Sequence, residues 1–146
     1  MQPDNDPDIG VIGLGLMGTA ITERLLEAGW RPHIWNRSSE KTGPLVDRGA
    51  IPSSNPIADC RRVIISLYSS DVVDEVLQKF LVALKPGQIL IDTTTGSPEF
   101  SERLAARLQQ QGADITLMAP DALAQHLERE RGELVPLIKS IGLTGT

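Results

Sequence analysis

The sequence predicts a doubly wound α/β fold, in which a mainly parallel sheet carries helices on both faces. Two observations lead to this fold class. Short apolar runs such as 9–12 and 63–67 have the length and composition of strands that are covered on both faces. Runs with apolar residues at three- and four-residue spacing follow them, so strands alternate with helices along the chain. With right-handed crossovers, we expect the strand order 3-2-1-4-5.

Length and composition fit one globular domain. A chain of 146 residues buries about two-thirds of its unfolded surface. The net charge of −5, with scattered basic residues, argues against a nucleic-acid partner. Cys60 is the single cysteine, so a disulfide and a cysteine-based metal cluster are excluded and a cytoplasmic location is favoured. No leader pattern and no run near the roughly 18 apolar residues of a membrane helix occurs, so we expect neither export nor membrane insertion.

The first predicted strand, at residues 9–12, leads directly into the turn Gly13-x-Gly15-x-x-Gly18 and then into a helix that ends near Gly29. In such a turn the first glycine permits a tight bend, the second lets backbone N–H groups approach a pyrophosphate, and the third lets the helix pack on the strand. The helix N-terminus then favours an anion. We therefore expect these residues to bind a dinucleotide: Gly13, Leu14, Gly15, Leu16, Met17 and Gly18.

The second predicted strand, at 33–35, ends in Asn36, Arg37 and Ser38. An NAD-binding site of this kind has an acidic side chain about 20 residues past the glycines, which accepts the ribose hydroxyls. Here Asn36 takes that place, and a guanidinium beside it can bind a 2′-phosphate with two hydrogen bonds. The pattern favours NADP(H) over NAD(H). The alternative is that Arg37 is a solvated cation in a turn.

The middle of the chain continues the alternation. Ser38 or Ser39 is expected to cap a short helix through 45–46 that stops at Gly49. Asn55 is expected to cap a single helical turn that begins with Pro56. A buried strand at 63–67 precedes a helix with apolar residues from 72 to 84, which Ser69-Ser70-Asp71 is expected to cap.

The last third follows the same pattern. A second buried strand is expected at 89–91, and Ser97 is expected to cap a helix that runs to Gly112. Further strands are expected at 115–118 and 134–135.

Ligands on such sheets bind at the carboxyl ends of the strands, which selects the loops 13–18, 67–70 and 92–97. At the third loop, Thr94 or Thr95 could hydrogen-bond a nicotinamide carboxamide or a substrate, with Gly96 beside them. The alternative is a plain strand-to-helix connection whose hydroxyls only turn the chain. His33 and His126 have no partners at metal-ligand spacing, so we assign them no chemistry and expect no metal site.

Three segments together resemble the NADP-binding, Rossmann-type domain of the β-hydroxyacid dehydrogenases, a family that includes 6-phosphogluconate dehydrogenase, 3-hydroxyisobutyrate dehydrogenase and the imine reductases. The segments are 10–18, then 35–38 with Lys41 and Gly49-Ala50, and finally 92–98. The resemblance implies dinucleotide contacts from 13–18, recognition of the 2′-phosphate by Asn36, Arg37 and Ser38, backbone contact near Leu67, and Thr95 beside the nicotinamide. It also implies hydride transfer to or from a small β-hydroxyacid or a related carbonyl or imine.

The chain departs from this family in its last third. Residues 119–124 read Ala-Pro-Asp-Ala-Leu-Ala where the family has a glycine- and serine-containing segment that lines the substrate pocket. None of its lysines stands in the glycine-rich motif that carries the family's proton-transferring lysine, so we assign no catalytic residue. We expect a flexible tail at 1–8 and a cofactor domain at 9–146, with the family's helical domain absent or supplied by a second chain. Oligomerisation stays open, and the alternative function is a non-catalytic NADP(H)-sensing or interaction module.

Overall fold

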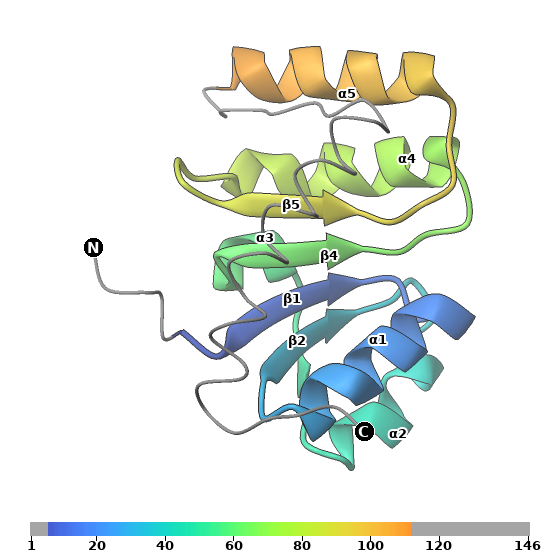
Figure 1. Cartoon of the computed structure of the whole chain (residues 1–146), viewed down its shortest axis with the longest axis vertical. Coiled ribbons are helices and arrows are strands. Elements are labelled where there is room, and N and C mark those ends of the chain that lie inside the picture. Colours follow the sequence, from blue (N-terminus) through green and yellow to red (C-terminus); the bar gives the residue numbers. More distant parts are fainter. Residues whose placement is uncertain (1–5, 112–146) are drawn as a thin grey trace, which may run out of the picture. The chain divides into compact units, whose positions relative to one another are not determined.

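The computed structural model describes residues 6–111, and the elements alternate between strands and helices (Figure 1). The strands point the same way, so their carboxyl ends lie together on the right-hand side of Figure 1. The bounds of the elements are β1 Asp8–Ile12, α1 Leu16–Glu27, β2 Arg31–Trp35, the 3-10 turn η1 Ser39–Lys41, α2 Gly43–Val46, β3 Ile51–Pro52, α3 Pro56–Asp59, β4 Arg62–Ile65, α4 Ser70–Phe80, the 3-10 turn η2 Leu81–Ala83, β5 Ile89–Asp92 and α5 Pro98–Gln110.

The sheet has the order β3-β2-β1-β4-β5 and all of its described pairings are parallel, which confirms the predicted fold class and strand order. β1 is the central strand, and its Gly10 lies opposite His33 of β2 on one side and Val63 of β4 on the other. The order reverses between β1 and β4. Ligands of doubly wound sheets bind outside the carboxyl ends of the strands, at the point where the strand order reverses.

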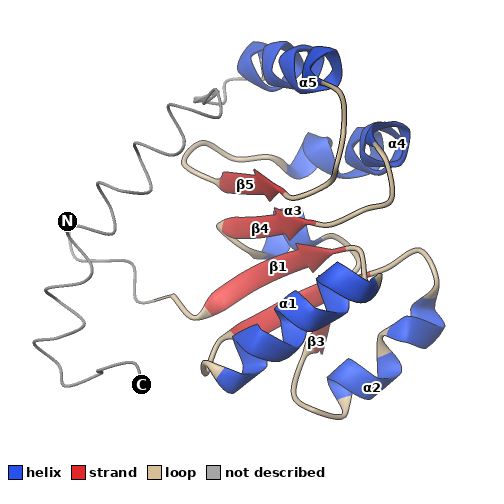
Figure 2. Ribbon diagram, turned by 45° about the vertical axis from the view of Figure 1, so that its right-hand side comes forward, coloured by secondary structure: helices blue, strands red, loops and turns tan. Residues whose placement is uncertain are grey.

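Each face of the sheet has its own apolar core, because side chains alternate between the faces along a strand. On one face, Val11 and Ile34 pack with residues of α1 and α2. On the other, Ile12 and Ile65 pack with residues of α3, α4 and α5. Figure 2 shows α1 on the first face and α3 on the opposite one. The helices of both faces thus fix the position of β1, which carries the glycine turn.

Three helices begin at a polar side chain that accepts a backbone N–H of the first turn. Asn55 accepts from Ile57, Ser69 caps α4, and Ser97 caps α5. These caps were predicted from the sequence, since Asn and Ser are favoured at this position. They fix the starting points of α4 and α5, which follow the loops at the carboxyl ends of β4 and β5.

Some elements differ from the sequence-based predictions. The short helix expected from Ser38 or Ser39 is split into η1 and α2, and Ser38 makes no side-chain cap bond. A proline at the second position of α2 explains the break, since proline is tolerated only in the first turn of a helix.

The strand at 89–91, predicted as buried, is also different, because Ile89 and Ile91 are 47% and 44% exposed. β5 is the outermost strand of the described sheet, so an apolar run there is not covered as it would be in the centre. Leu16, at the start of the apolar pattern of α1, is almost fully exposed.

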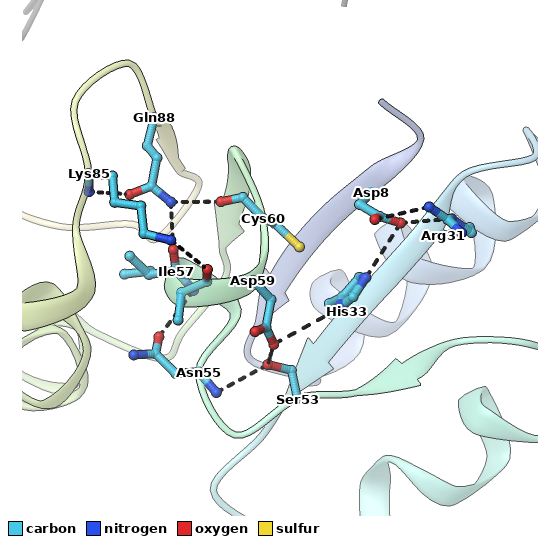
Figure 3. Close-up of polar contacts among 11 residues, drawn as sticks. Asp8, Arg31, His33, Ser53, Asn55, Ile57, Asp59, Cys60, Lys85 and Gln88 are labelled. Carbon is cyan, nitrogen blue, oxygen red and sulfur yellow. Dashed lines mark hydrogen bonds and ion pairs between the residues drawn. The ribbon is translucent and has the colours of Figure 1, made fainter. Parts of the chain in front are cut away.

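The amino ends of the strands are held by a polar network, shown in Figure 3. Gln88 donates to the carbonyls of Ile57 and Cys60 and so ties the segment before β5 to α3. His33 lies between Asp8, at 3.4 Å, and Asp59, at 4.0 Å. This network lies at the amino edge of the sheet, away from the loops that were predicted to bind ligand.

The predicted strands at 115–118 and 134–135, the segment 119–124 and His126 lie outside the described residues. Among the residues that the structure describes, no helix has the length and apolar character needed to cross a membrane.

Candidate functional site

The glycine turn after β1 is built so closely that two of its glycines have no space for a side chain. Gly13 has a φ of +99°, and a Cβ there would lie 2.0 Å from the carbonyl oxygen of Ser66. A Cβ on Gly18 would lie 1.8 Å from the carbonyl oxygen of Gly13. Both obstacles are backbone atoms, which cannot rotate away. The first and third glycines are therefore required by the turn itself, which agrees with the roles predicted for them.

Gly15 is different, because a Cβ there would meet no atom within 4 Å. It is the N-cap residue of α1 and, unlike the residues that cap α3, α4 and α5, it has no side chain that accepts the first-turn amides. The first amides of a helix have no partner within the helix, so those of α1 are available to an external acceptor. Leu16 and Met17, whose side chains are 97% and 62% exposed, lie in this first turn. An open approach to free amides is what a dinucleotide pyrophosphate requires, so the residues present fit that group.

Asn36 connects the glycine turn to the loop after β2. Its side-chain oxygen accepts the N–H of Leu14 at 3.0 Å, and its side-chain nitrogen donates to the carbonyl of Ser38 at 3.0 Å. Gly13 N–H also donates to the carbonyl of Trp35, at 2.8 Å. The amide of Asn36 thus has partners at both ends and holds the two loops together. Sequence reasoning placed Asn36 at the ribose but did not foresee this positioning role.

Arg37 lies directly after Asn36, at the carboxyl end of β2, as predicted. Its Nη2 is 2.8 Å from Oε2 of Glu75 in α4, and the two side chains are 61% and 54% exposed. The partner is 38 residues away along the chain. No local pattern pointed to Glu75, because an ion pair between distant segments is visible only once the helices are placed.

The loops after β4 and β5 are joined to each other. The N–H of Leu67 donates to Oγ1 of Thr94 at 3.0 Å, and Oγ1 of Thr93 donates to the carbonyl of Ile65 at 2.9 Å. A Cβ on Gly96 would lie 2.2 Å from the hydroxyl oxygen of Ser70, so the third loop also touches the start of α4. The hydroxyl of Thr94 therefore orders the two loops.

Thr95 is exposed beside this junction and Tyr68, in the neighbouring loop, is 94% exposed. The three loops predicted from the sequence thus lie along one edge of the sheet.

A cavity of about 600 Å³ opens beside the glycine turn, between α1 and the segment that contains η1 and α2. Its walls include Gly15, Thr19 and Leu45, with the basic residues Lys41 and Arg48 at its border. Arg48 is paired with Glu23 of α1. Lys41, which belongs to the second matched segment, lines the same cavity as Gly15.

Cys60 and His33 lie away from this edge. Burial of Cys60 raises the pKa of its thiol from 9.0 to about 12, and the negative charges of Asp8, Asp59 and Asp6 add to the rise. The thiol is therefore protonated at neutral pH and is no nucleophile. In the described part of the chain, no group of three His, Cys, Asp or Glu side chains could hold a metal ion.

Residues 8–120 match a family described as the NAD binding domain of 6-phosphogluconate dehydrogenase. An NADPH-dependent reductive aminase of Aspergillus oryzae is 35% identical over 108 residues, which are 72% of this chain and 36% of that protein. An L-threonate dehydrogenase of Cupriavidus necator is 33% identical over 119 residues, which are 77% of this chain and 40% of that protein. The chain thus spans well under half the length of these relatives.

Solved structures agree with this fold. An imine reductase from a Pseudomonas species superposes with a TM-score of 0.69 at 31% identity, over 75% of this chain and 39% of that one. An imine reductase from Myxococcus stipitatus in complex with NADP+ gives a TM-score of 0.69 at 27% identity, over 74% of this chain and 39% of that one. The family match over residues 8–120 includes the sheet and the three loops at its carboxyl edge.

Proposed function

Since the chain belongs to the family described as the NAD binding domain of 6-phosphogluconate dehydrogenase, we propose that it binds NADP(H) in preference to NAD(H). We further propose that it forms the cofactor-binding part of an oxidoreductase that acts on a small β-hydroxyacid or on a related carbonyl or imine. Nicotinamide cofactor binding follows from the family. The phosphorylated cofactor and the substrate class are the steps that we add.

The proposal depends on two features that occur together: the uncapped N-terminus of α1, and an arginine at the end of the neighbouring strand β2. Gly15 leaves the first-turn amides of α1 accessible, and Arg37 stands at the carboxyl end of β2. No carboxylate occupies the position of Asn36, where NAD-binding sites hold the ribose hydroxyls. The complex of the Myxococcus stipitatus imine reductase with NADP+ supports the choice of the phosphorylated cofactor.

Each part of the site then has a separate task. The amides of residues 15–18 would hold the pyrophosphate, and Arg37 with Ser38 the 2′-phosphate. Asn36 keeps the two loops at a fixed spacing through its bonds to Leu14 and Ser38. Thr95 and Gly96, next to the Leu67–Thr94 junction, are the residues that we assign to the nicotinamide and substrate side. When bound, the cofactor supplies the hydride that is given to or taken from the substrate.

Calorimetry with NADPH and NADH on the 146-residue chain tests the proposal. A hydrogen-bonded charge contributes about 1.5–3 kcal/mol, so we expect NADPH to bind more than about tenfold more tightly than NADH. Arg37→Ala should remove most of that difference. Arg24→Ala, which removes the same charge from an exposed site of α1, is the matched control and should leave it intact. Equal affinity for both cofactors would refute the proposed preference.

Turnover is the second readout. We expect the chain by itself to bind NADPH with little oxidation or reduction of β-hydroxyacids, carbonyls or imines, since none of its lysines stands in the family's glycine-rich motif. The alternative, a non-catalytic NADP(H)-sensing module, would use the same site. It would be favoured if activity stayed absent after a helical domain of the family was supplied.

A further inference from the structure

The residue that we assign to the 2′-phosphate already has an anionic partner. Nη2 of Arg37 lies 2.8 Å from a carboxylate oxygen of Glu75, which is ordinary ion-pair geometry. Glu75 lies in the middle of α4, on a turn whose neighbours Val76 and Leu77 are buried in the core. The helix is thus fixed by packing, and the carboxylate is held within reach of the guanidinium.

The ion pair crosses the point at which the strand order reverses. Arg37 follows β2, and Glu75 belongs to the helix that follows β4; these two strands lie on opposite sides of β1. The glycine turn begins at the end of β1. A dinucleotide whose pyrophosphate lies at that turn and whose ribose reaches Arg37 therefore brings its 2′-phosphate to a guanidinium that Glu75 also contacts.

We propose that Glu75 sets the cofactor preference of the site, because its carboxylate competes with the 2′-phosphate for Arg37. This inference rests on the proposed function, since it assumes that Arg37 is the 2′-phosphate ligand. A phosphate and a carboxylate at the same guanidinium repel each other, so the negative charge of Glu75 weakens binding of NADP(H). NAD(H) has hydroxyls at the ribose and does not meet this repulsion.

The exposure of both partners makes the exchange feasible. At 61% and 54% exposure the pair is solvated and screened, and surface ion pairs of this kind contribute little to stability. A dianionic phosphate group offers the guanidinium a stronger partner than a single carboxylate does. Arg37 can therefore leave Glu75 when the cofactor binds, without loss of the fold.

Glu75→Gln tests the inference, since it keeps the size of the side chain and removes its charge. We expect calorimetry to show NADPH binding about tenfold more tightly than to the unmodified chain, which corresponds to about 1.4 kcal/mol. The affinity for NADH should change by less than twofold. The gain for NADPH should shrink between low salt and about 0.5 M salt, because screening weakens contacts between exposed charges.

Two variants serve as controls. Glu102→Gln removes the same charge from an exposed position of α5 and should leave the affinity for NADPH unchanged. Glu75→Asp keeps the charge on a shorter side chain and should give an NADPH affinity between those of the unmodified chain and Glu75→Gln. Circular dichroism of each variant checks that α4 and the rest of the fold are retained.

The outcomes separate the inference from the proposed function. The NADPH-to-NADH ratio of the unmodified chain tests the proposed function, and the change of NADPH affinity in Glu75→Gln tests the role of Glu75. An unchanged or weakened NADPH affinity in that variant overturns the inference; weakening would mean that Glu75 orients Arg37 for the phosphate. If the unmodified chain shows no preference for NADPH, the proposed preference fails. The inference fails with it only if Glu75→Gln also gains no affinity for NADPH.

Discussion

Replacing Gly15 with alanine should impair cofactor binding while leaving the fold in place. The added methyl group meets no atom of the chain within 4 Å, and the residue has φ −72° and ψ −164°, which alanine adopts freely. The loss of stability is then limited to the lower preference of alanine for the N-cap, about 0.5–1 kcal/mol. The space that the methyl group fills is the space through which a pyrophosphate would reach the amides of α1.

The size of the binding defect follows from the same geometry. A methyl group forced into a closely packed contact costs about 1–3 kcal/mol, which corresponds to a loss of about fivefold to 150-fold in NADPH affinity. Calorimetry gives the affinity, and urea denaturation followed by tryptophan fluorescence gives the stability. The two measurements on one variant separate an effect on binding from an effect on folding.

Gly18→Ala and Gly43→Ala are the matched comparisons. The Cβ of Gly18→Ala would lie 1.8 Å from the carbonyl oxygen of Gly13, so stability and binding should both fall, with a loss of stability above about 2 kcal/mol. Gly43 has no atom near its added methyl group, so its variant should keep both properties. Our reading of the turn would be refuted if Gly15→Ala bound NADPH as well as the unmodified chain, or if it unfolded like Gly18→Ala.

Three further predictions concern other parts of the fold. Phe80→Ala should lower the free energy of unfolding in urea by about 3–5 kcal/mol, because Phe80 is buried and its ring packs edge-to-face with that of Trp35, with 5.0 Å between the ring centroids. A loss below about 1 kcal/mol would contradict this packing. Thr94→Val should cost about 0.5–1.5 kcal/mol by removing the acceptor of the partly buried N–H of Leu67, and Thr94→Ser, which keeps the hydroxyl, should retain most of the stability. Cys60 should resist iodoacetamide at pH 8 until the chain is unfolded, and rapid labelling of the native chain would count against its burial. The pKa of the Cys60 thiol rises from 9.0 to about 12 on folding, so the unfolded thiol loses its proton at a lower pH than the folded one. The free energy of unfolding should therefore fall as the pH rises from 9 toward 12, and this fall should be smaller in Cys60→Ala.

For Arg37, the sequence predicted the position of the residue but not its ion pair with Glu75. The residue type and its distance from the glycine turn were sufficient to place it at the carboxyl end of β2, because that position depends only on the length of one strand–helix–strand unit. Its contact with Glu75 depends on how α4 packs across the sheet. The side-chain bonds of Asn36 and Thr94 belong to the same class, since each joins two loops that are distant in the sequence.

The sequence by itself determined the order of strands and helices, the glycine turn and the polar caps, because periodicity, turn chemistry and capping act between residues a few positions apart. The strand order followed as well, since parallel strands with right-handed crossovers leave few arrangements. Only the tertiary structure decided that Ile89 and Ile91 are partly exposed at the edge of the described sheet and that Arg37 forms an ion pair with Glu75. The exposure of a side chain and the partner of a charged group depend on which surfaces meet after the helices pack. A local pattern of residues does not predict these contacts.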